Sequence, residues 1–178
     1  MAIKNKAKES YLIGQCLKNN RQAQKKLYDQ YKDAMYTLAF RITARHQDAE
    51  DVLQETFIQV FLNLSTFRGK SSLGAWIKTI LIRNAIRQTK IVINHRELNE
   101  INQKDQSLSI DENLTGYYIE NAILKLDPGY RTVFIMAEIE GYKHREISQI
   151  LDISVGTSKS QLYHAKDQLR KTLESAYY

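Results

Sequence analysis

Residues that interrupt regular structure are scarce along this chain. Its 178 residues include a single proline, Pro128, and seven glycines. An all-β fold needs a turn about every 8–12 residues, so this scarcity predicts helices instead. Apolar residues make up 43% of the sequence, which is enough to bury a hydrophobic core and argues against a wholly disordered chain. We therefore expect an all-α fold.

Composition narrows the classes of partner and chemistry. A net charge of +6 is typical of proteins that bind nucleic acid or an anionic membrane surface. Cys16 is the only cysteine, which excludes a disulfide framework and a cysteine-based zinc site. The first residues lack the apolar segment of a secretory signal, and no run approaches the roughly 18 apolar residues of a membrane span. We expect a cytoplasmic protein that is not itself a membrane protein.

Charge is distributed in blocks rather than evenly. Four acids lie between Asp48 and Glu55, and residues 56–96 then contain seven basic residues and no acid. Residues 97–120 reverse the balance with six acids against one lysine. The segment 94–115 is polar and shows no sustained helical stripe, which is typical of a linker. We predict two small helical domains, at 1–93 and 116–178, joined by an acidic flexible linker at 94–115.

Helical periodicity predicts an amphipathic helix over residues 48–64. One face carries core residues such as Leu53 and Phe57, and the opposite face carries acids interleaved with Ile58 and Leu62. A purely solvated face does not normally carry large apolar residues, so a protein partner with basic and apolar groups would explain them. Acids also favour a helix N-terminus through the helix dipole. Spacing alone does not decide between these two interpretations.

A basic loop is predicted over residues 65–72. Gly69 breaks the preceding helix, and Ser72 is suited to cap the helix predicted over 73–90. A cationic loop with a nearby aromatic residue fits a binding site for single-stranded nucleic acid. The alternative is an ordinary surface loop.

The helix that follows carries basic residues on one side. Arg83, Arg87 and Lys90 lie together and are suited to contacts with phosphates. Asn84 falls near the apolar stripe of the same helix. Its spacing favours a buried amide with satisfied hydrogen bonds.

The C-terminal domain has the pattern of a helix-turn-helix motif. We predict helices over 119–126, 128–140, 144–151 and 154–173, with Ser154 as the N-cap of the last one. The second helix of such a motif enters the major groove of DNA, which places residues 159–164 near bases or phosphates. The alternative is a helical hairpin with a solvated face.

Residues with catalytic potential do not converge in this sequence. The four histidines show no metal-ligand spacing, and the adjacent Glu50 and Asp51 diverge on their helix. We therefore expect no catalytic residue, no metal site, no cofactor and no small-molecule substrate. A nuclease would need a convergent cluster of carboxylates or a metal site.

Several short motifs follow one another in order. They are 48–57 (DAEDVLQETF), 67–76 (FRGKSSLGAW), 82–85 (IRNA), 126–134 (LDPGYRTVF), 140–142 (EGY) and 156–162 (GTSKSQL). Together they resemble regions 2 and 4 of the extracytoplasmic-function (ECF, group IV) RNA polymerase sigma factors of the sigma-70 family. The resemblance covers nearly the whole chain in the family's order and spacing.

The resemblance implies a transcription initiation factor that directs core RNA polymerase to promoters. It assigns the acidic helix to polymerase binding, through Asp48, Glu50, Asp51, Gln54 and Glu55. It assigns recognition of the melted −10 element to Arg68, Gly69, Lys70, Ser71, Ser72, Leu73, Arg83, Asn84 and Arg87. It assigns recognition of the −35 duplex to Lys159, Ser160, Tyr163 and His164.

The resemblance also implies partners. These are core RNA polymerase (its β′ clamp helices and β flap), promoter DNA and an anti-sigma factor that holds the protein inactive. Gln161 and His164 stand where the family often has arginine, which leaves the base preference open. Asp152 stands where the turn usually has glycine, and aspartate tolerates a left-handed backbone better than most residues. The alternative function, a helix-turn-helix regulator independent of core polymerase, leaves the acidic helix face unexplained.

Overall fold

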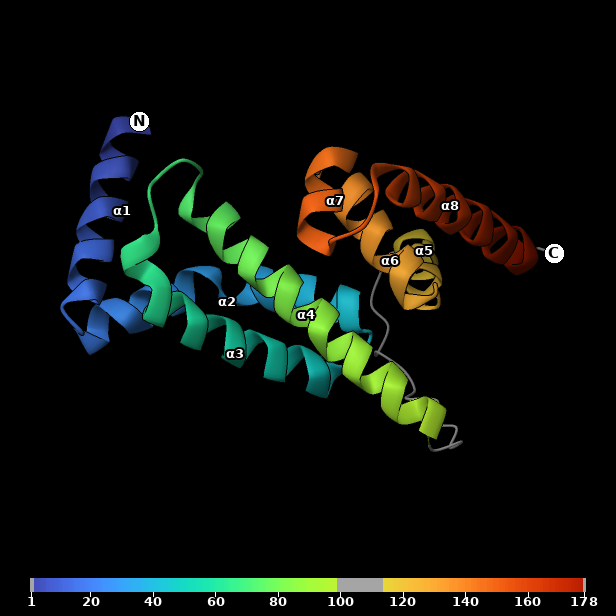
Figure 1. Cartoon of the computed structure of the whole chain (residues 1–178), viewed down its shortest axis with the longest axis horizontal. Coiled ribbons are helices and arrows are strands. Elements are labelled where there is room, and N and C mark those ends of the chain that lie inside the picture. Colours follow the sequence, from blue (N-terminus) through green and yellow to red (C-terminus); the bar gives the residue numbers. More distant parts are fainter. Residues whose placement is uncertain (1, 99–113, 178) are drawn as a thin grey trace.

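The described part of the chain folds into helices. The computed structural model describes residues 2–98 and 114–177, and every regular element within these ranges is helical (Figure 1). The predicted all-α class is therefore confirmed. Most of the predicted linker falls at 99–113, outside the described residues, so its flexibility stays a prediction. In the described part of the chain, no helix combines the length and apolar character needed to cross a membrane.

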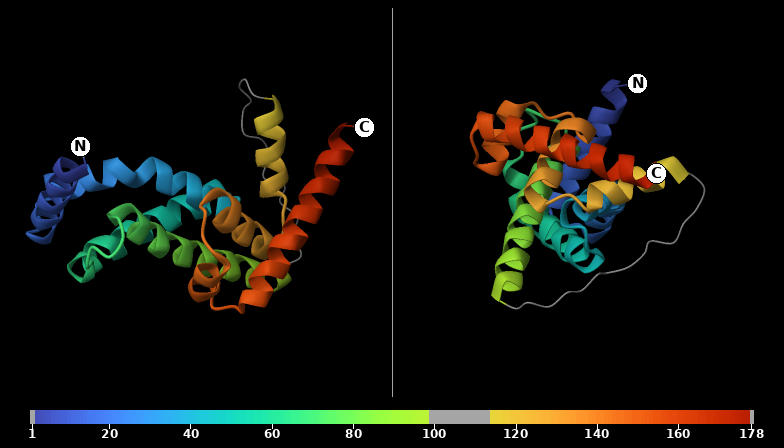
Figure 2. Two further views of the ribbon diagram at one scale, coloured as in Figure 1. Left: turned by 90° about the horizontal axis from the view of Figure 1, so that it is seen from above. Right: turned by 90° about the vertical axis from the view of Figure 1, so that its right-hand side faces the viewer.

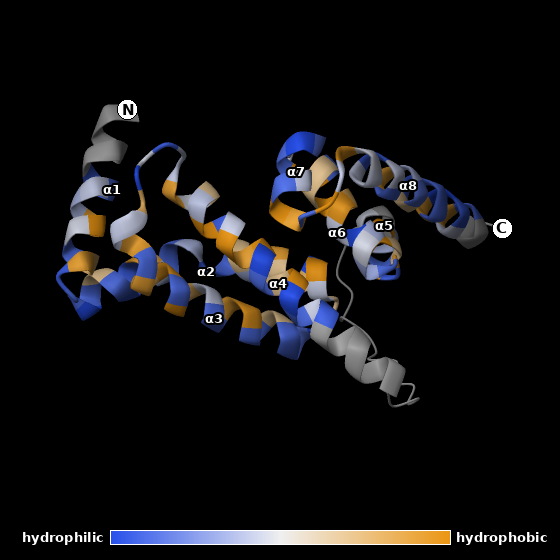
Figure 3. Cartoon of the chain, in the orientation of Figure 1, coloured by the Kyte–Doolittle hydropathy of each residue, from blue (hydrophilic) through white to orange (hydrophobic). Residues whose placement is uncertain are grey.

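The N-terminal domain is a bundle of three helices with a fourth across one end (Figures 1 and 2). Its elements are α1 (Ala2–Leu17), α2 (Arg21–Thr43), α3 (His46–Asn63), the 3-10 turn η1 (Leu64–Thr66) and α4 (Leu73–Leu98). Leu27, Ile42, Val60, Ile77 and Leu81 are fully buried, and they come from α2, α3 and α4. Burial of this apolar surface is the main term that stabilises the bundle. Figure 3 shows apolar residues recurring along the helices where these pack together.

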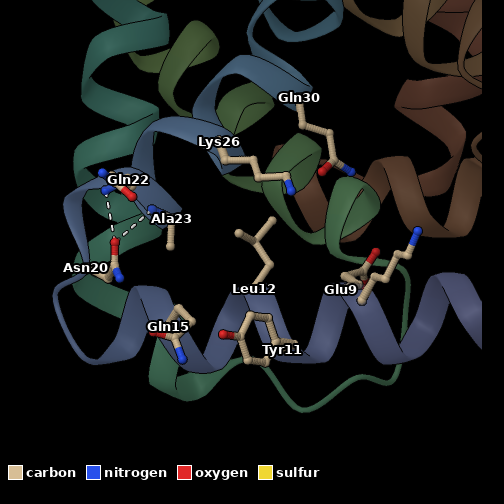
Figure 4. Close-up of a pocket in the computed structure, with 10 residues that line it drawn as sticks. Glu9, Tyr11, Leu12, Gln15, Asn20, Gln22, Ala23, Lys26 and Gln30 are labelled. Atoms are coloured by element: carbon tan, nitrogen blue, oxygen red, sulfur yellow. Dashed lines mark hydrogen bonds between the residues drawn. The ribbon is translucent and has the colours of Figure 1, made fainter.

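Local sequence explains where two of these helices begin and end. Asn20 caps α2, because its Oδ1 accepts hydrogen bonds from the backbone N–H groups of Gln22 (3.0 Å) and Ala23 (3.1 Å) (Figure 4). This cap borders an open hollow of about 890 Å³ between α1 and α2. Helix α4 continues to Leu98, past the predicted end near residue 90, because 91–98 contains neither glycine nor proline to stop it.

The C-terminal domain contains the predicted helix-turn-helix. Its elements are α5 (Leu114–Leu124), α6 (Pro128–Phe134), the π-helical segment η2 (Ile135–Ile139), α7 (His144–Leu151) and α8 (Val155–Tyr177). Asp152, in the turn between α7 and α8, adopts φ +56°, which confirms the left-handed turn expected there. Ser154 caps α8 as predicted, because its Oγ accepts a hydrogen bond from the backbone N–H of Thr157 at 2.9 Å.

One predicted helix of this domain changes type along its length. The sequence predicts a single helix over 128–140, whereas the structure has α6 followed by the π-helical η2. The backbone N–H of Glu140 donates to the carbonyl of Ile135 (2.9 Å), five residues earlier rather than four. Gly141 then ends the helix with φ +73°, a conformation that glycine adopts without strain.

The two domains pack against each other. Helices α5 and α6 contact α2, and α7 contacts α4. In Figures 1 and 2, α6 and α7 lie beside α4, and α8 extends away from the N-terminal domain. The C-terminal domain therefore lies against the helix that carries the predicted DNA-binding residues.

Candidate functional site

Helix α3 presents an acidic face that also carries large apolar side chains. Glu50, Asp51 and Gln54 are exposed, and Ile58 and Leu62 beside them are 54% and 75% exposed. We call these five residues the acidic face of α3. The helix dipole acts only within the first turn, so it gives no reason for apolar residues two to four turns further on. The exposure of Ile58 and Leu62 favours a protein partner.

Two of the five predicted polymerase-binding residues have contacts within the domain. Asp48 is buried, where its Oδ1 accepts a hydrogen bond from Gln88 (3.2 Å) and its Oδ2 lies 3.6 Å from Arg45. Glu55 is half-buried and lies 3.7 Å from the guanidinium of Arg87. Asp48 thus links α3 to α4 and stands apart from the exposed set. The periodicity of α3 places Asp48 in line with Asp51, but a neighbouring helix covers it.

The predicted basic loop is exposed and anchored at both ends. Arg68 to Ser72 are exposed, and Gly69 adopts φ +66°. Before them, the ring of Phe67 packs on Trp76 at a centroid distance of 5.5 Å. After them, the Oγ of Ser72 accepts a hydrogen bond from the backbone N–H of Ala75 (3.2 Å), so Ser72 caps α4 as predicted. The five exposed loop residues are therefore presented from a fixed base.

Two other predicted −10 residues lie in the core. Leu73 is fully buried, and Asn84 is 5% exposed. The Nδ2 of Asn84 donates to the Oγ1 of Thr56 on α3 at 3.2 Å. Asn84 is thus a buried amide with a hydrogen-bond partner, as its spacing indicated. Its side chain ties α4 to α3 beneath the surface.

The basic side chains of α4 form a ridge on its surface. Arg83, Arg87 and Lys90 are exposed, and we call them the basic ridge of α4. They repeat at three- and four-residue intervals, so they lie above one another on one side of the helix. Cations arranged in this way suit the phosphates of a nucleic acid strand.

The last helix presents the residues predicted to read duplex DNA. Lys159, Ser160, Tyr163 and His164 are exposed in the first turns of α8, and we call them the reading face of α8. The ring of His164 stacks on Tyr130 of α6 at a centroid distance of 5.6 Å, so α6 supports it from behind. Tyr163 is 70% exposed. The reading face therefore combines a cation, a hydroxyl and two rings that base edges and phosphates can contact.

Within the motif, α7 and α8 are joined by a polar contact. Nδ1 of His144 and the Oγ of Ser158, which is fully buried, lie 2.9 Å apart. The contact holds the start of α8 against α7. The orientation of the reading face is thus set by α7 as well as by the turn.

Arg131 is a residue whose role sequence reasoning missed. It is 5% exposed, and its Nε (3.1 Å) and Nη2 (2.9 Å) both donate to the carbonyl of Ile42 at the end of α2. Its Nη1 donates to the carbonyls of Leu124 and Leu126, both at 2.9 Å. Burial lowers its pKa to about 10, against the opposing effect of the Asp127 carboxylate. The guanidinium remains protonated at neutral pH and joins the ends of two helices from different domains.

Two ion pairs accompany Arg131 between the domains. The carboxylate of Glu120 accepts hydrogen bonds from Nε (2.8 Å) and Nη2 (3.2 Å) of Arg41. Glu140 pairs with Lys78 of α4. The partners in these pairs are 79 and 62 residues apart in sequence, so no local pattern could have indicated them.

Chemistry based on metal ions receives no support from the described side chains. In the part of the chain that the structure describes, no group of three or more histidine, cysteine or acidic side chains is placed to hold a metal ion. Three exposed surfaces stand out. They are the acidic face of α3, the basic loop at 68–72 together with the basic ridge of α4, and the reading face of α8. All three are suited to binding macromolecules.

Two solved structures have a similar fold, and one of them is a sigma factor. The sigma factor RpoE of Bartonella quintana, solved with the anti-sigma factor NepR, has a TM-score of 0.65 and 22% identity, covering 84% of this chain and 96% of that one. CnrH, solved with the cytosolic domain of CnrY, has a TM-score of 0.58 and 22% identity, covering 93% and 96%. At this level of identity the likeness concerns the fold.

Sequence comparisons identify the family. The family models for Sigma-70 region 2 and Sigma-70, region 4 match residues 27–90 and 117–169. The ECF RNA polymerase sigma factor SigW of Bacillus subtilis (strain 168) is 31% identical over 179 aligned residues, covering 90% of this chain and 94% of SigW. ECF RNA polymerase sigma factor SigE of Mycolicibacterium smegmatis is 28% identical, covering 83% of this chain and 60% of SigE. This chain therefore belongs to the ECF RNA polymerase sigma factors, the transcription initiation factors that direct RNA polymerase to promoters.

Proposed function

We propose that the acidic face of α3 binds the β′ clamp helices of core RNA polymerase. The observation that carries this proposal is the exposure of Ile58 (54%) and Leu62 (75%) among carboxylates. Apolar side chains at the centre of an interface supply affinity, and surrounding charges supply orientation and a faster encounter. Glu55 contributes from the edge of this face. We assign Asp48 to holding α3 against α4, where it orients the face.

We propose further that the basic loop and the basic ridge of α4 hold the melted strand of the −10 element. The loop residues Arg68 to Ser72 are exposed, Leu73 is buried where α4 begins, and Asn84 is buried next to Arg83 of the ridge. Taking a base out of the duplex costs a few kcal/mol of stacking and pairing. Contacts made only with the extruded strand offset this cost, so melting proceeds on binding energy without ATP.

The reading face of α8 is proposed to contact the −35 duplex from the major groove. Its cation and hydroxyl are placed to contact phosphates, and Tyr163 and His164 are placed to contact base edges. We also propose that the β flap of polymerase holds the C-terminal domain, and that an anti-sigma factor binds this protein, as NepR binds RpoE. The protein acts in the cytoplasm as an initiation factor without catalysis of its own. A regulator independent of polymerase is not favoured, because such a regulator needs no region 2.

The polymerase surface is tested by reversing charge where it is exposed. In the full chain, Glu50→Lys with Asp51→Lys should weaken binding to purified core polymerase about tenfold or more, a change of about 1.4 kcal/mol in binding free energy. Leu62→Ser should weaken binding in the same pull-down. Both variants should keep the helical circular dichroism of the parent, because the altered side chains are exposed.

A matched control separates polymerase binding from promoter recognition. Lys159→Ala with Tyr163→Ala should retain core polymerase but lose promoter-specific transcripts in run-off assays on fragmented genomic DNA from the source bacterium. Undiminished core binding by the charge-reversed variant would overturn the assignment of α3. Loss of core polymerase binding by the α8 variant would overturn the assignment of polymerase binding to α3 and of promoter recognition to α8.

A further inference from the structure

Two neighbouring rings hold the side chain of His164 on the reading face of α8. The imidazole stacks on the ring of Tyr130 of α6, with a centroid distance of 5.6 Å and an interplanar angle of 27°. The ring of Tyr163 meets the imidazole in a T-shaped arrangement, at 5.6 Å and 76°. Both arrangements are favourable beyond the surface area that the rings bury. Because Tyr130 is half-buried and His164 is exposed, the imidazole is held from the side of α6 and remains accessible.

Stacking orients this histidine without using its nitrogens. His46 and His144, the other histidines whose side chains the structure describes, bring Nδ1 to within 2.7 and 2.9 Å of the hydroxyl groups of Tyr36 and Ser158. For His164, the described part of the chain offers no hydrogen-bond partner to either ring nitrogen. A ring that is fixed in this way keeps its full hydrogen-bonding capacity for a ligand.

Gln161 lies one turn before His164 on the same helix but is packed against α6. Its Nε2 lies 3.5 Å from the point that a Cβ would occupy on Gly129. Gln161 also lines a gap of about 250 Å³ together with Pro128 and Leu151. The start of α6 therefore treats the two side chains differently, since Gln161 packs beside it and His164 is presented by it.

We infer that Tyr130 is a specificity-determining residue of this protein, which acts by orienting His164 towards one base of the −35 element. This inference rests on the proposed role of the reading face in contacting the −35 duplex. Tyr130 is a positioning residue, because it acts through the imidazole on which it stacks. A ring that is already oriented loses less conformational entropy when it binds, so its hydrogen bond contributes more to recognition.

The chemistry of the imidazole predicts which kind of base His164 favours. The ring offers at least one N–H donor whether it is neutral or protonated. In the major groove, both purines present the acceptor N7, beside O6 in guanine and beside an amino group in adenine. A single donor can bond to N7 without reading the second group. We therefore expect a preference for a purine on one strand of about fivefold, the net contribution of one hydrogen bond.

Randomised −35 elements test the role of Tyr130. The full chain with core polymerase transcribes a library built on a promoter found with the parent protein, in which each template carries a transcribed barcode. His164→Ala should remove the purine preference of about fivefold at one position and leave the preferences at other positions unchanged. Tyr130→Leu should remove most of the same preference, whereas Tyr130→Phe should keep it because the stacking ring is retained.

Two further variants separate positioning from an effect on the fold. Tyr130→Leu added to His164→Ala should change nothing further, because a residue that acts only through the imidazole has no effect once the imidazole is gone. His164→Arg replaces one donor by a planar fork that binds N7 and O6 together. The preference at the same position should then narrow from a purine to guanine, by about tenfold over adenine.

The outcomes distinguish this inference from the proposed function. Tyr130→Leu with the parent's preference, or with every position weakened equally, would overturn the inference and leave the proposed function intact. A further change in the double variant would show that Tyr130 acts through the fold, with the same consequence. Absence of any −35 preference in the parent would overturn the proposed reading face, and this inference with it.

Discussion

Replacement of Arg131 by lysine should destabilise the whole chain. The guanidinium makes four charge-assisted hydrogen bonds to three carbonyls, and at 5% exposure it has almost no access to water. Lysine keeps the charge but has one ammonium group instead of a planar fork, so about two of these bonds are lost. Hydrogen bonds to charged groups contribute about 1.5–3 kcal/mol each. We expect Arg131→Lys to lower the free energy of unfolding by about 3 kcal/mol.

Urea denaturation followed by circular dichroism measures this change. The control is Arg21→Lys at the exposed start of α2, which should alter the free energy of unfolding by less than about 0.5 kcal/mol. A loss below about 1 kcal/mol for Arg131→Lys would refute the view that the fork joins the domains. A change in the slope of the urea dependence would indicate that the domains have begun to unfold separately.

Three further changes test individual contacts. Thr56→Val removes the acceptor of the buried Asn84 amide and should cost about 1–3 kcal/mol in urea denaturation, whereas Thr56→Ser should stay close to the parent. Asp48→Asn should lower the free energy of unfolding by roughly 1 kcal/mol and leave core polymerase binding unchanged in a pull-down. Unchanged stability with weakened polymerase binding would place Asp48 on the docking surface. A hydrogen bond from Lys171 holds the pKa of Asp167 below its ordinary value. The contact therefore stabilises the fold at pH values above the ordinary aspartate pKa, and this stabilisation is lost as the pH falls through the lowered pKa of Asp167. Titration by NMR should show this pKa rising towards its ordinary value in Lys171→Met.

Periodicity and capping residues predicted much of the fold. The amphipathic pattern of α3 predicted both the burial of Phe57 and the exposure of Leu62, and the structure confirms both. Ser72 and Ser154 cap the helices that they were expected to cap. These predictions are confirmed because each depends only on residues within one or two helical turns of one another.

Contacts between distant segments were not predictable in the same way. The position of Asp48 on its helix resembles that of Asp51, yet Gln88 from α4 covers it, and only the packing of α4 reveals this. Arg131 is 89 residues from the carbonyl it binds, and basic residues are usually exposed. A buried arginine or a carboxylate between domains leaves no periodic signal in one sequence.

The π-helical segment has a consequence for comparing this chain with its relatives. Between Ile135 and Ile139 the helix contains one residue more than an α-helix needs to cover the same rise. Deletion of a single residue there would restore ordinary α-helical hydrogen bonding and leave Glu140 and Gly141 near their present positions. An alignment with a relative one residue shorter should therefore place its gap inside 135–139, not in the turn that follows. Evolutionary change in the length of this helix can be absorbed without disturbing the DNA-binding motif downstream.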